Sequence, residues 1–498
     1  MISMEFFLNG LMIALQPENL FFCFMGVLGG TLIGVLPGIG PTATVAILLP
    51  ATFDLNPTTA IIMLAGINYG AAYGGSTTAI LVNVPGEASS VVTCLDGYKM
   101  ARQGRAGPAL GISAFGSYIA GTLSIVGVML FSPILARVGV AFGPPEYFAL
   151  ILTALMIVTY LVKGSMFKAW IMVALGLVLG TLGNDPLSGR ERFSYGVLIL
   201  RDGIGLVPLV IGMFGVSEIL ETMGATVIPE VFQKKVRGIL PTLRDWKDSG
   251  WPIIRSSLIG FFLGIFPGMT PMIPTLLSYG VEKKLSRHPE KFGEGAIEGV
   301  AAAESCNNAA STAGFVPLFS LGIPSNAFNA VMLGALMIYG LQPGPLLIQT
   351  NPEFFWGVIA SMYLGNIMLV VLNLPLIPVW ISILRVPYTL LSIFIIIFCF
   401  LGSYSINNST FDAFMTFFFG IVGFVLKRYD FELPPLILAF VLGPLVESTF
   451  RQSLMISGGD FGIFFTRPIS AVLIFLAVGV IITAFIKRKP IAEIESET

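Results

Sequence analysis

Two polar segments interrupt a chain that is otherwise dominated by apolar residues. The first runs from Asn68 to Ser90 and the second from Glu304 to Asn326, and neither contains lysine or arginine. Their hydroxyl and amide oxygens suit a hard cation such as Na+, whereas helix N-termini beside Pro-Gly breaks present free N–H groups to an anion. The two segments therefore predict a site that holds a small anion together with a cation.

The elements around these segments are expected to be transmembrane helices. Only 11% of the 498 residues are charged, against about 25% in soluble domains, and 55% are hydrophobic. So few charges cannot cover a water-facing surface, so most of the surface must face lipid. Apolar runs such as 150–162, 388–401 and 469–486 span a bilayer with the help of their flanks. The sequence predicts an all-α polytopic membrane protein with about 10–12 spans.

One apolar segment is too short for two full crossings. Cytoplasmic loops collect Lys and Arg, and this rule places both Arg255 and Lys283 inside the cell. The apolar residues between them can form a re-entrant hairpin that bends at 266–271, the run Phe-Pro-Gly-Met-Thr-Pro. Irregular backbone at that depth is tolerated where it is buried in protein or lines a cavity.

The same rule orients the rest of the chain and places its C-terminus in the cytoplasm. A mixed-sign loop that carries Arg190, Arg192 and Arg201 falls on the outside, among acidic residues. The clusters expected inside are 99–105, 163–168, 234–255, 283–291, Arg385, 427–428 and 487–489.

The hairpin has a counterpart near the N-terminus. Residues 34–41 match 264–271, and residues 84–88 match 323–327, downstream of Asn68 and Asn307 respectively. The loops that follow carry opposite charge signatures: 51–58 has no basic residue whereas 281–291 is strongly basic, and 96–105 is basic whereas 328–353 has no Lys or Arg. This pattern predicts two inverted repeats, each a re-entrant hairpin plus about five transmembrane helices. The alternative is Pro-Gly pairs that only kink ordinary spans.

The repeats divide the chain into five parts. These are an N-terminal interfacial or first helix (1–17); a first repeat (18–233) with a hairpin at 19–51, a broken helix at 58–86 and helices to 223; a cytoplasmic linker (234–251); a second repeat (252–447) with a hairpin at 252–282, broken helices at 294–342 and helices to 447; and a loop, final transmembrane helix and cytoplasmic tail (448–498). The N-terminal part lacks the basic region and cleavage site of a signal peptide.

The candidate site residues follow from the breaks and the polar segments. Those expected to bind the anion are Gly38, Gly40, Pro41, Thr42, Asn68, Ser76, Thr77, Thr78, Pro85, Gly86, Gly268, Thr270, Asn307, Asn308, Ser311, Thr312, Pro324, Ser325 and Asn326. The candidates for cation coupling are Asn83, Glu87 and Glu304, since an acid within the membrane is a functional hypothesis by default.

Each kind of residue also has a structural interpretation. Small hydroxyl residues equally permit close helix packing, and the glycines and prolines are expected to shape the site without touching the ligand. Glu304 can instead be a protonated acid that bonds to a neighbouring helix.

Other functions are excluded by composition. A net charge of -1 gives no basis for nucleic-acid binding. The single histidine, His288, lies in a charged loop, which argues against a histidine metal centre or a Ser-His triad. The sequence therefore predicts neither an enzyme nor a bound cofactor, apart from Na+ as the coupling ion.

Two further polar stretches, 182–193 and 442–453, look alike. They are expected to be exposed loops. Their charges either pair with each other or dock a partner protein.

The quoted motifs resemble the large membrane subunit of the tripartite tricarboxylate transporters, the TctA family. The resemblance runs from about residue 20 to 470 and rests on 34–41, 70–87, 96–107, 266–271, 304–312 with 322–326, and 442–453. It implies a bacterial inner-membrane protein that works with a small integral membrane subunit and a periplasmic solute-binding protein. The substrates implied are citrate and other tri- or dicarboxylates, taken up with a cation gradient, commonly Na+. The family is also similar to elevator-type transporters.

The hypothesis that joins these observations is coupled transport. The hairpins and broken helices form a transport domain, whereas the long helices 107–136 and 352–376 supply a scaffold. Since neither polar segment carries a fixed cation, bound Na+ offsets the carboxylate charge. The alternative is an anion channel or uncoupled facilitator for small organic acids, which requires a continuous weakly binding path.

Overall fold

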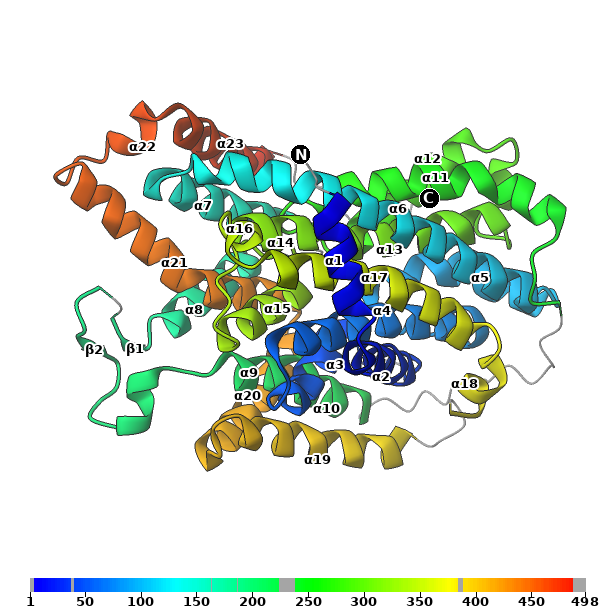
Figure 1. Ribbon diagram of the computed structural model, residues 1–498, viewed down its shortest axis with the longest axis horizontal. Helices are drawn as coiled ribbons and strands as arrows, with labels where there is room; N and C mark the ends of the chain where they lie inside the picture. The colour runs from blue at the N-terminus through cyan, green and yellow to red at the C-terminus, as the bar shows by residue number, and fades with distance from the viewer. Residues whose placement is uncertain are drawn as a thin grey trace.

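The protein is almost entirely helical, as a computed structural model shows (Figure 1). The model describes residues 4–36, 40–162, 164–185, 187–223, 238–383 and 388–486. Within these ranges the strands are β1 (Gly183–Asn184) and β2 (Glu191–Arg192), which pair antiparallel. The prediction of an α-helical fold is confirmed. Predictions on Lys163, 234–237, Arg385 and 487–489 lie outside the described residues.

The first half of the chain contains ten α-helices and several short turns of helix among the described residues. They are α1 (Met4–Ala14), α2 (Pro17–Gly34), α3 (Pro41–Leu48), η1 (Leu49–Thr52), α4 (Pro57–Val82), η2 (Ala88–Ser90), α5 (Val91–Arg102), α6 (Ala106–Val140), α7 (Pro144–Tyr160), α8 (Met166–Gly180), η3 (Leu198–Asp202), α9 (Leu206–Val210), the π-helix η4 (Ile211–Val216) and α10 (Ser217–Met223).

The second half repeats much of this order. Its elements are α11 (Leu243–Gly264), α12 (Met272–Leu285), η5 (Pro289–Lys291), α13 (Ile297–Ala313), α14 (Phe315–Leu321), α15 (Ala327–Ile338), α16 (Leu347–Thr350), α17 (Pro352–Asn373), α18 (Ile377–Ile383), α19 (Tyr388–Asn407), α20 (Thr410–Arg428), α21 (Pro434–Ile456), α22 (Ile463–Thr466) and α23 (Pro468–Ile486).

Both predicted breakers separate two helices. The first lies between α2 and α3, and the second between α11 and α12. Proline explains both restarts, because Pro41 occupies the first turn of α3 and Pro271 is the N-cap of α12, where a missing N–H costs nothing. At the second bend Gly268 has φ +85°, which favours glycine. In each half the second helix of the pair is followed by a long helix, an extended segment and another helix.

The helix predicted at 58–86 is not broken at its polar residues, contrary to expectation. Helix α4 is continuous through the polar residues and ends at Asn83, whose φ of 59° places it in the left-handed region. The glycines of α4 do not break the helix. They let α2 approach it closely. A Cβ on Gly70 would lie 2.3 Å from the carbonyl oxygen of Val27, and one on Gly34 would lie 2.2 Å from that of Ala71. The small residues here therefore serve close packing.

The predicted linker 234–251 is also shorter than expected. Helix α11 begins at Leu243, after a capping box in which Thr242 and Asp245 bond to each other's backbone. Two turns of helix therefore precede the predicted start of the second hairpin at 252.

The helices of the two halves are interleaved. Helix α2 packs against α4, and α11 packs against α13 in the same way. Helix α6 of the first half lies along α13, and α17 of the second half lies along α4. Further out, α8 packs against α21, whereas α20 packs against η4. Each half thus completes the core of the other.

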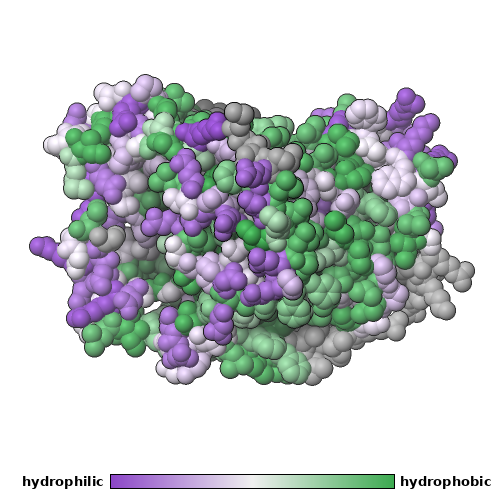
Figure 2. Space-filling model, viewed as in Figure 1, coloured by the Kyte–Doolittle hydropathy of each residue, from purple (hydrophilic) through white to green (hydrophobic). Residues whose placement is uncertain are grey.

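Several helices suit a membrane. By length and composition, four helices among the described residues could cross it: α2, α6, α17 and α20. Shorter apolar helices of 10–17 residues occur in α7, α8 and α15 and in the described parts of α19 and α23. Figure 2 shows hydrophobic residues gathered over the right half and lower middle of one face, and hydrophilic residues gathered toward the left end. The chain is a multi-pass membrane protein.

The basic cluster 99–105 contacts two segments that are near or within other clusters predicted to lie on the same side of the membrane, 283–291 and 234–255. Lys99 at the end of α5 forms an ion pair with Glu294, at 2.8 Å, and Arg105 forms one with Asp245, at 2.6 Å. The ends of α5, α11 and α12 lie toward the right of Figure 1, whereas β1–β2 and α22 lie at the left. The mixed-sign loop predicted to lie outside thus lies at the opposite end of the molecule.

Candidate anion-binding site

A cavity of about 390 Å³ lies where the breaks of the two halves meet. Ligand pockets generally measure about 300–1,000 Å³, so a small organic acid fits. Its lining includes the following predicted residues: Gly40, Pro41, Thr42, Asn68, Pro85, Gly86, Glu87, Thr270, Ser311 and Asn326. Residues from α3, α4, the two extended segments, α12 and α13 thus converge on one space. The predicted role of each residue in binding stays a prediction.

Four helix N-termini line this cavity. Pro41 begins α3, Glu87 precedes η2 and α5, Pro271 precedes α12, and Asn326 precedes α15. The first-turn N–H groups of a helix have no partner within that helix and carry a partial positive charge. Since α3 packs against α15, and α12 packs against η2 and α5, the termini form two pairs. The cavity therefore offers backbone donors to an anion from two sides.

Hydrogen bonds join the bend between α11 and α12 to the extended segment before α15. Asn326 caps α15, because its Oδ1 accepts from the backbone N–H of Asn329 at 3.0 Å. The amide of Asn329 donates to Ser325 Oγ at 2.7 Å, and Gly268 N–H donates to the carbonyl of Ser325 at 2.8 Å. The bend between α11 and α12 is thus bonded directly to the extended segment before α15, although neither Gly268 nor Ser325 lines the cavity.

Glu87 lines the cavity from the first extended segment, which lies between α4 and η2. Its carboxylate accepts from Ser89 Oγ at 2.6 Å and from Asn307 Nδ2 at 2.7 Å. None of the lining residues is a lysine or an arginine. The amide oxygen of buried Asn307 has no hydrogen-bond partner among the described residues. Oxygens without a fixed cation are therefore available beside the anion donors.

Asn68 provides a free donor on the cavity wall. Its side chain is 4% exposed, and its Nδ2 has no hydrogen-bond partner among the described residues. A buried amide N–H left unpaired costs about 1–3 kcal/mol. This cost is recovered when a ligand oxygen accepts from it.

Other predicted site residues lie elsewhere. Thr78 Oγ1 bonds to the carbonyl of Val35 at 2.8 Å, and Thr77 Oγ1 bonds to that of Tyr73, so both support helix packing. Gly38 lies outside the described residues. Asn307, Asn308, Thr312 and Pro324 are buried beside the cavity but are not part of its lining.

Glu304 and Asn83 do not line the cavity either. Glu304 is 1% exposed and accepts hydrogen bonds from Ser76 Oγ at 2.6 Å and from Thr93 Oγ1. This matches the alternative in which the acid bonds to neighbouring helices, here α4 and α5. Asn83 is exposed at the end of α4. Of the three candidates for cation coupling, only Glu87 lines the cavity.

The part of the cavity wall that other helices contribute was not predicted from the sequence. Phe214 of η4, Glu218 of α10 and Pro434 of α21 also line the cavity. Glu218 follows an apolar stretch, 204–216, and an acid next to such a stretch is a signal in its own right. Short π-helices such as η4 occur frequently at functional sites.

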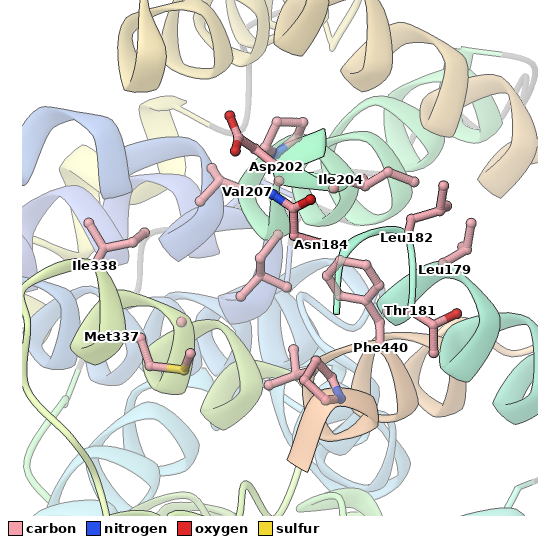
Figure 3. A pocket seen from close by; sticks show the side chains of 18 of the residues that line it. Leu179, Thr181, Leu182, Asn184, Asp202, Ile204, Val207, Met337, Ile338 and Phe440 are labelled. Carbon is pink, nitrogen blue, oxygen red and sulfur yellow. The ribbon is translucent and has the colours of Figure 1, made fainter. Parts of the chain in front are cut away.

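A larger cavity, of about 630 Å³, lies between the ends of α8, α9, α15 and α21 (Figure 3). Its wall is mainly apolar, with Leu179, Val207, Met337 and Phe440 among the labelled side chains. Its lining includes Arg192, Arg201, Asp202 and Glu447, and Arg192 pairs with Glu447 at 2.7 Å. The four helix N-termini described above line the smaller cavity, which makes that cavity the better candidate for an anion.

The two look-alike polar stretches meet beside this larger cavity. Arg192 pairs with Asp185 at 2.9 Å and with Glu447 at 2.7 Å, and Arg451 pairs with the same two acids at 2.9 and 3.0 Å. The prediction that their charges pair with each other is confirmed. The prediction of two loops is wrong for 442–453, which lies within α21 because its apolar positions pack against α7 and α8.

Comparison with known proteins identifies the family. The model of the tripartite tricarboxylate transporter TctA family matches residues 20–438. The chain belongs to this family. The resemblance seen in the breakers and polar segments is thereby confirmed, and the chain is a subunit of a tricarboxylate transporter.

Two relatives come from Agrobacterium vitis. One, described as an uncharacterized 52.8 kDa protein in the TAR-I ttuC' 3' region, is 48% identical over 473 residues, which cover 95% of this chain and 94% of the relative. The other, described as an uncharacterized protein in the TAR-II ttuC' 3' region, is 48% identical over 227 residues, covering 46% of this chain and 94% of the relative. No solved structure matches the chain.

Proposed function

We propose that the chain is the large permease subunit of a binding-protein-dependent secondary transporter. It imports tri- or dicarboxylates of the citrate type, driven by a cation gradient, with Na+ as the coupling ion. Its partners are a small integral membrane subunit and a periplasmic solute-binding protein. It resides in the bacterial inner membrane with its C-terminus in the cytoplasm. One observation carries this proposal: four helix N-termini line a cavity that has no basic residue in its lining.

The N-termini bind the substrate carboxylates. Backbone N–H groups at helix starts favour negative charge, and two pairs of them can hold two carboxylates of one molecule. Thr42, Asn68 and Ser311 add side-chain donors around this space. Charge-assisted hydrogen bonds of this kind are roughly twice as strong as neutral ones.

The coupling ion offsets the negative charge that the substrate brings. Glu87 already places a carboxylate on the wall, and no lysine or arginine among the lining residues balances it. A di- or trivalent anion beside it is therefore unfavourable unless a cation enters as well. Glu87 and the unpaired oxygen of Asn307 supply hard ligands for Na+. By linkage, each ion then raises the affinity for the other by the same factor.

We infer an elevator-like alternating-access mechanism for the movement. The hairpins α2–α3 and α11–α12, with α4, α5, α13 and α15, form the moving body, and α6 and α17 belong to the scaffold. The shared order of elements and the reversed charge of the loops support an inverted arrangement of the repeats. The ends of α5 and α12, which both carry basic residues, lie toward the same side of Figure 1, and this supports the inverted arrangement.

Uptake into proteoliposomes tests the proposal. They would contain this chain and its small membrane partner, with the binding protein outside, and radiolabelled citrate and a panel of other carboxylates would be offered with and without an inward Na+ gradient. Accumulation that depends on the gradient and is lost in Asn68→Ala is the expected result. Equilibration without any response to Na+ or pH gradients would instead favour the channel or uncoupled facilitator.

A further inference from the structure

An acid on the wall of an anion site requires an explanation. Glu218 lines the cavity from α10, one turn after Phe214 of η4. A carboxylate there repels the substrate carboxylates that the helix N-termini attract. Two like charges at contact distance near a protein surface repel each other strongly. Unlike the Glu87 carboxylate, which accepts from the uncharged side chains of Ser89 and Asn307, the Glu218 carboxylate has its charge balanced by a basic side chain.

Lys427 supplies that balance from behind the wall. Its ammonium group on α20 forms an ion pair with Glu218, and a second pair with Glu221 at 3.1 Å. Lys427 itself does not line the cavity. Among the described contacts, Lys427 is the basic residue that bonds directly to a residue of the cavity lining.

The three side chains form a series of ion pairs from the cavity wall to a more exposed carboxylate. The Glu218 side chain is 26% exposed and that of Lys427 is 21% exposed, whereas the Glu221 side chain is 54% exposed. An ammonium group on a flexible four-carbon stem can change partners within such a series without a change in the backbone. Arg428, the next residue on α20, does not take part, because its guanidinium lies over the ring of Phe424 at 5.4 Å.

We propose that Lys427 is a transient carboxylate-binding residue behind the Glu218 wall of the cavity, and that Glu218 is its resident counter-ion. A substrate carboxylate that leaves the helix N-termini exchanges with Glu218 on the Lys427 ammonium. When the substrate has departed, Glu218 pairs with Lys427 again, and this wall no longer attracts the anion. This inference rests on the proposed function, because it takes the substrate to be a carboxylate held in this cavity.

Opposite effects of the two substitutions test the exchange. Equilibrium binding of radiolabelled citrate, and of the other carboxylates of the panel, is measured on purified protein in nanodiscs. Lys427→Met leaves Glu218 uncompensated and should weaken binding about tenfold. Glu218→Gln frees the ammonium for the substrate and should strengthen binding several-fold while slowing efflux from preloaded proteoliposomes. The double variant should return toward the wild-type affinity.

Two controls separate charge from folding. Arg428→Gln removes a neighbouring positive charge on α20 and should leave the affinity unchanged, whereas Lys427→Arg should retain it. Higher salt should reduce the effect of Lys427→Met, since screening weakens interactions between partly exposed charges. Variants are compared only where size-exclusion profiles match the wild type.

The outcomes are distinct for the inference and for the function. If both single substitutions change affinity in the same direction, or if neither changes it while the wild type binds, the exchange at Lys427 is overturned. If Lys427→Met does not fold, Glu218→Gln alone decides, because weaker or unchanged binding contradicts the inference. If the wild type binds no carboxylate of the panel, it is the proposed function that fails.

Discussion

Replacing Glu87 by glutamine should separate cation binding from substrate binding. The Glu87 carboxylate accepts from Ser89 and Asn307, and glutamine keeps the size of the side chain and one accepting oxygen. The substitution therefore removes the charge with little change of shape. The cavity and the donor groups of the four helix N-termini should stay as they are.

The magnitude follows from Coulomb's law. A cation bound about 4 Å from a carboxylate, at an effective dielectric constant of about 20, is stabilised by about 4 kcal/mol. Water in the cavity screens part of this, so we take about 1.4 kcal/mol, a tenfold loss of Na+ affinity, as the lower bound. The same substitution removes a repulsion from the substrate. Carboxylate binding without Na+ should therefore rise while its stimulation by Na+ falls.

Carboxylate binding to purified protein across a series of Na+ concentrations measures both effects. Glu304→Gln is the matched control, because Glu304 is also a buried acid but bonds to Ser76 and Thr93 away from the cavity. It should keep the Na+ dependence of the wild type. A Glu87→Gln variant that retains the wild-type stimulation by Na+ would refute the assignment of the cation to this wall.

Three further predictions concern the site, the packing and the charged cluster. Asn68→Ala should weaken carboxylate binding about tenfold, because it removes a donor worth about 1–3 kcal/mol, and a binding isotherm checks this. Gly70→Ala should lower the melting temperature by several degrees, because its Cβ would lie 2.3 Å from a carbonyl oxygen of α2, and a thermal melt in detergent measures the loss. A serine hydroxyl and Arg451 hold the pKa of the Asp185 carboxyl below its usual range, and arginine side chains do the same for the pKa of Glu447. Such depressed pKa values stabilise the folded state above the unfolded value near about 4, and this stability is lost as the pH falls through the folded values. Arg451→Met should thus melt lower at pH 7 and show a shallower loss below about pH 5, and equal slopes in both proteins would contradict the assignment.

Much of the site could be predicted because a few adjacent residues determine where a helix breaks. Proline at the start of α3 and before α12, and a glycine that permits φ +85°, fix where the helices stop and restart. The N-termini they create are a direct consequence of the sequence. Gly40, Pro41 and Thr270 could be assigned to the cavity for this reason.

The side chains along continuous helices could not be assigned in this way. Asn68 and Thr78 both lie on α4, yet one lines the cavity and the other bonds to the loop after α2. The choice depends on which helix covers which face of α4, and this is decided by packing. Glu218 was missed for the same reason, because its approach to the cavity depends on how η4 packs against α3 and how α10 packs against η4 and α20.

The bond between Gly268 N–H and the carbonyl of Ser325 has a consequence for how the substrate range of such a transporter can change. It joins main chain to main chain, and the donors at the four helix starts are main-chain groups as well. Substituting side chains leaves these groups in place, as long as the breaks persist. The part of the anion affinity that these main-chain donors supply is thus resistant to side-chain substitution. The choice among carboxylates falls to a few positions such as Thr42, Asn68 and Ser311, where single substitutions could retune the transporter without rebuilding it.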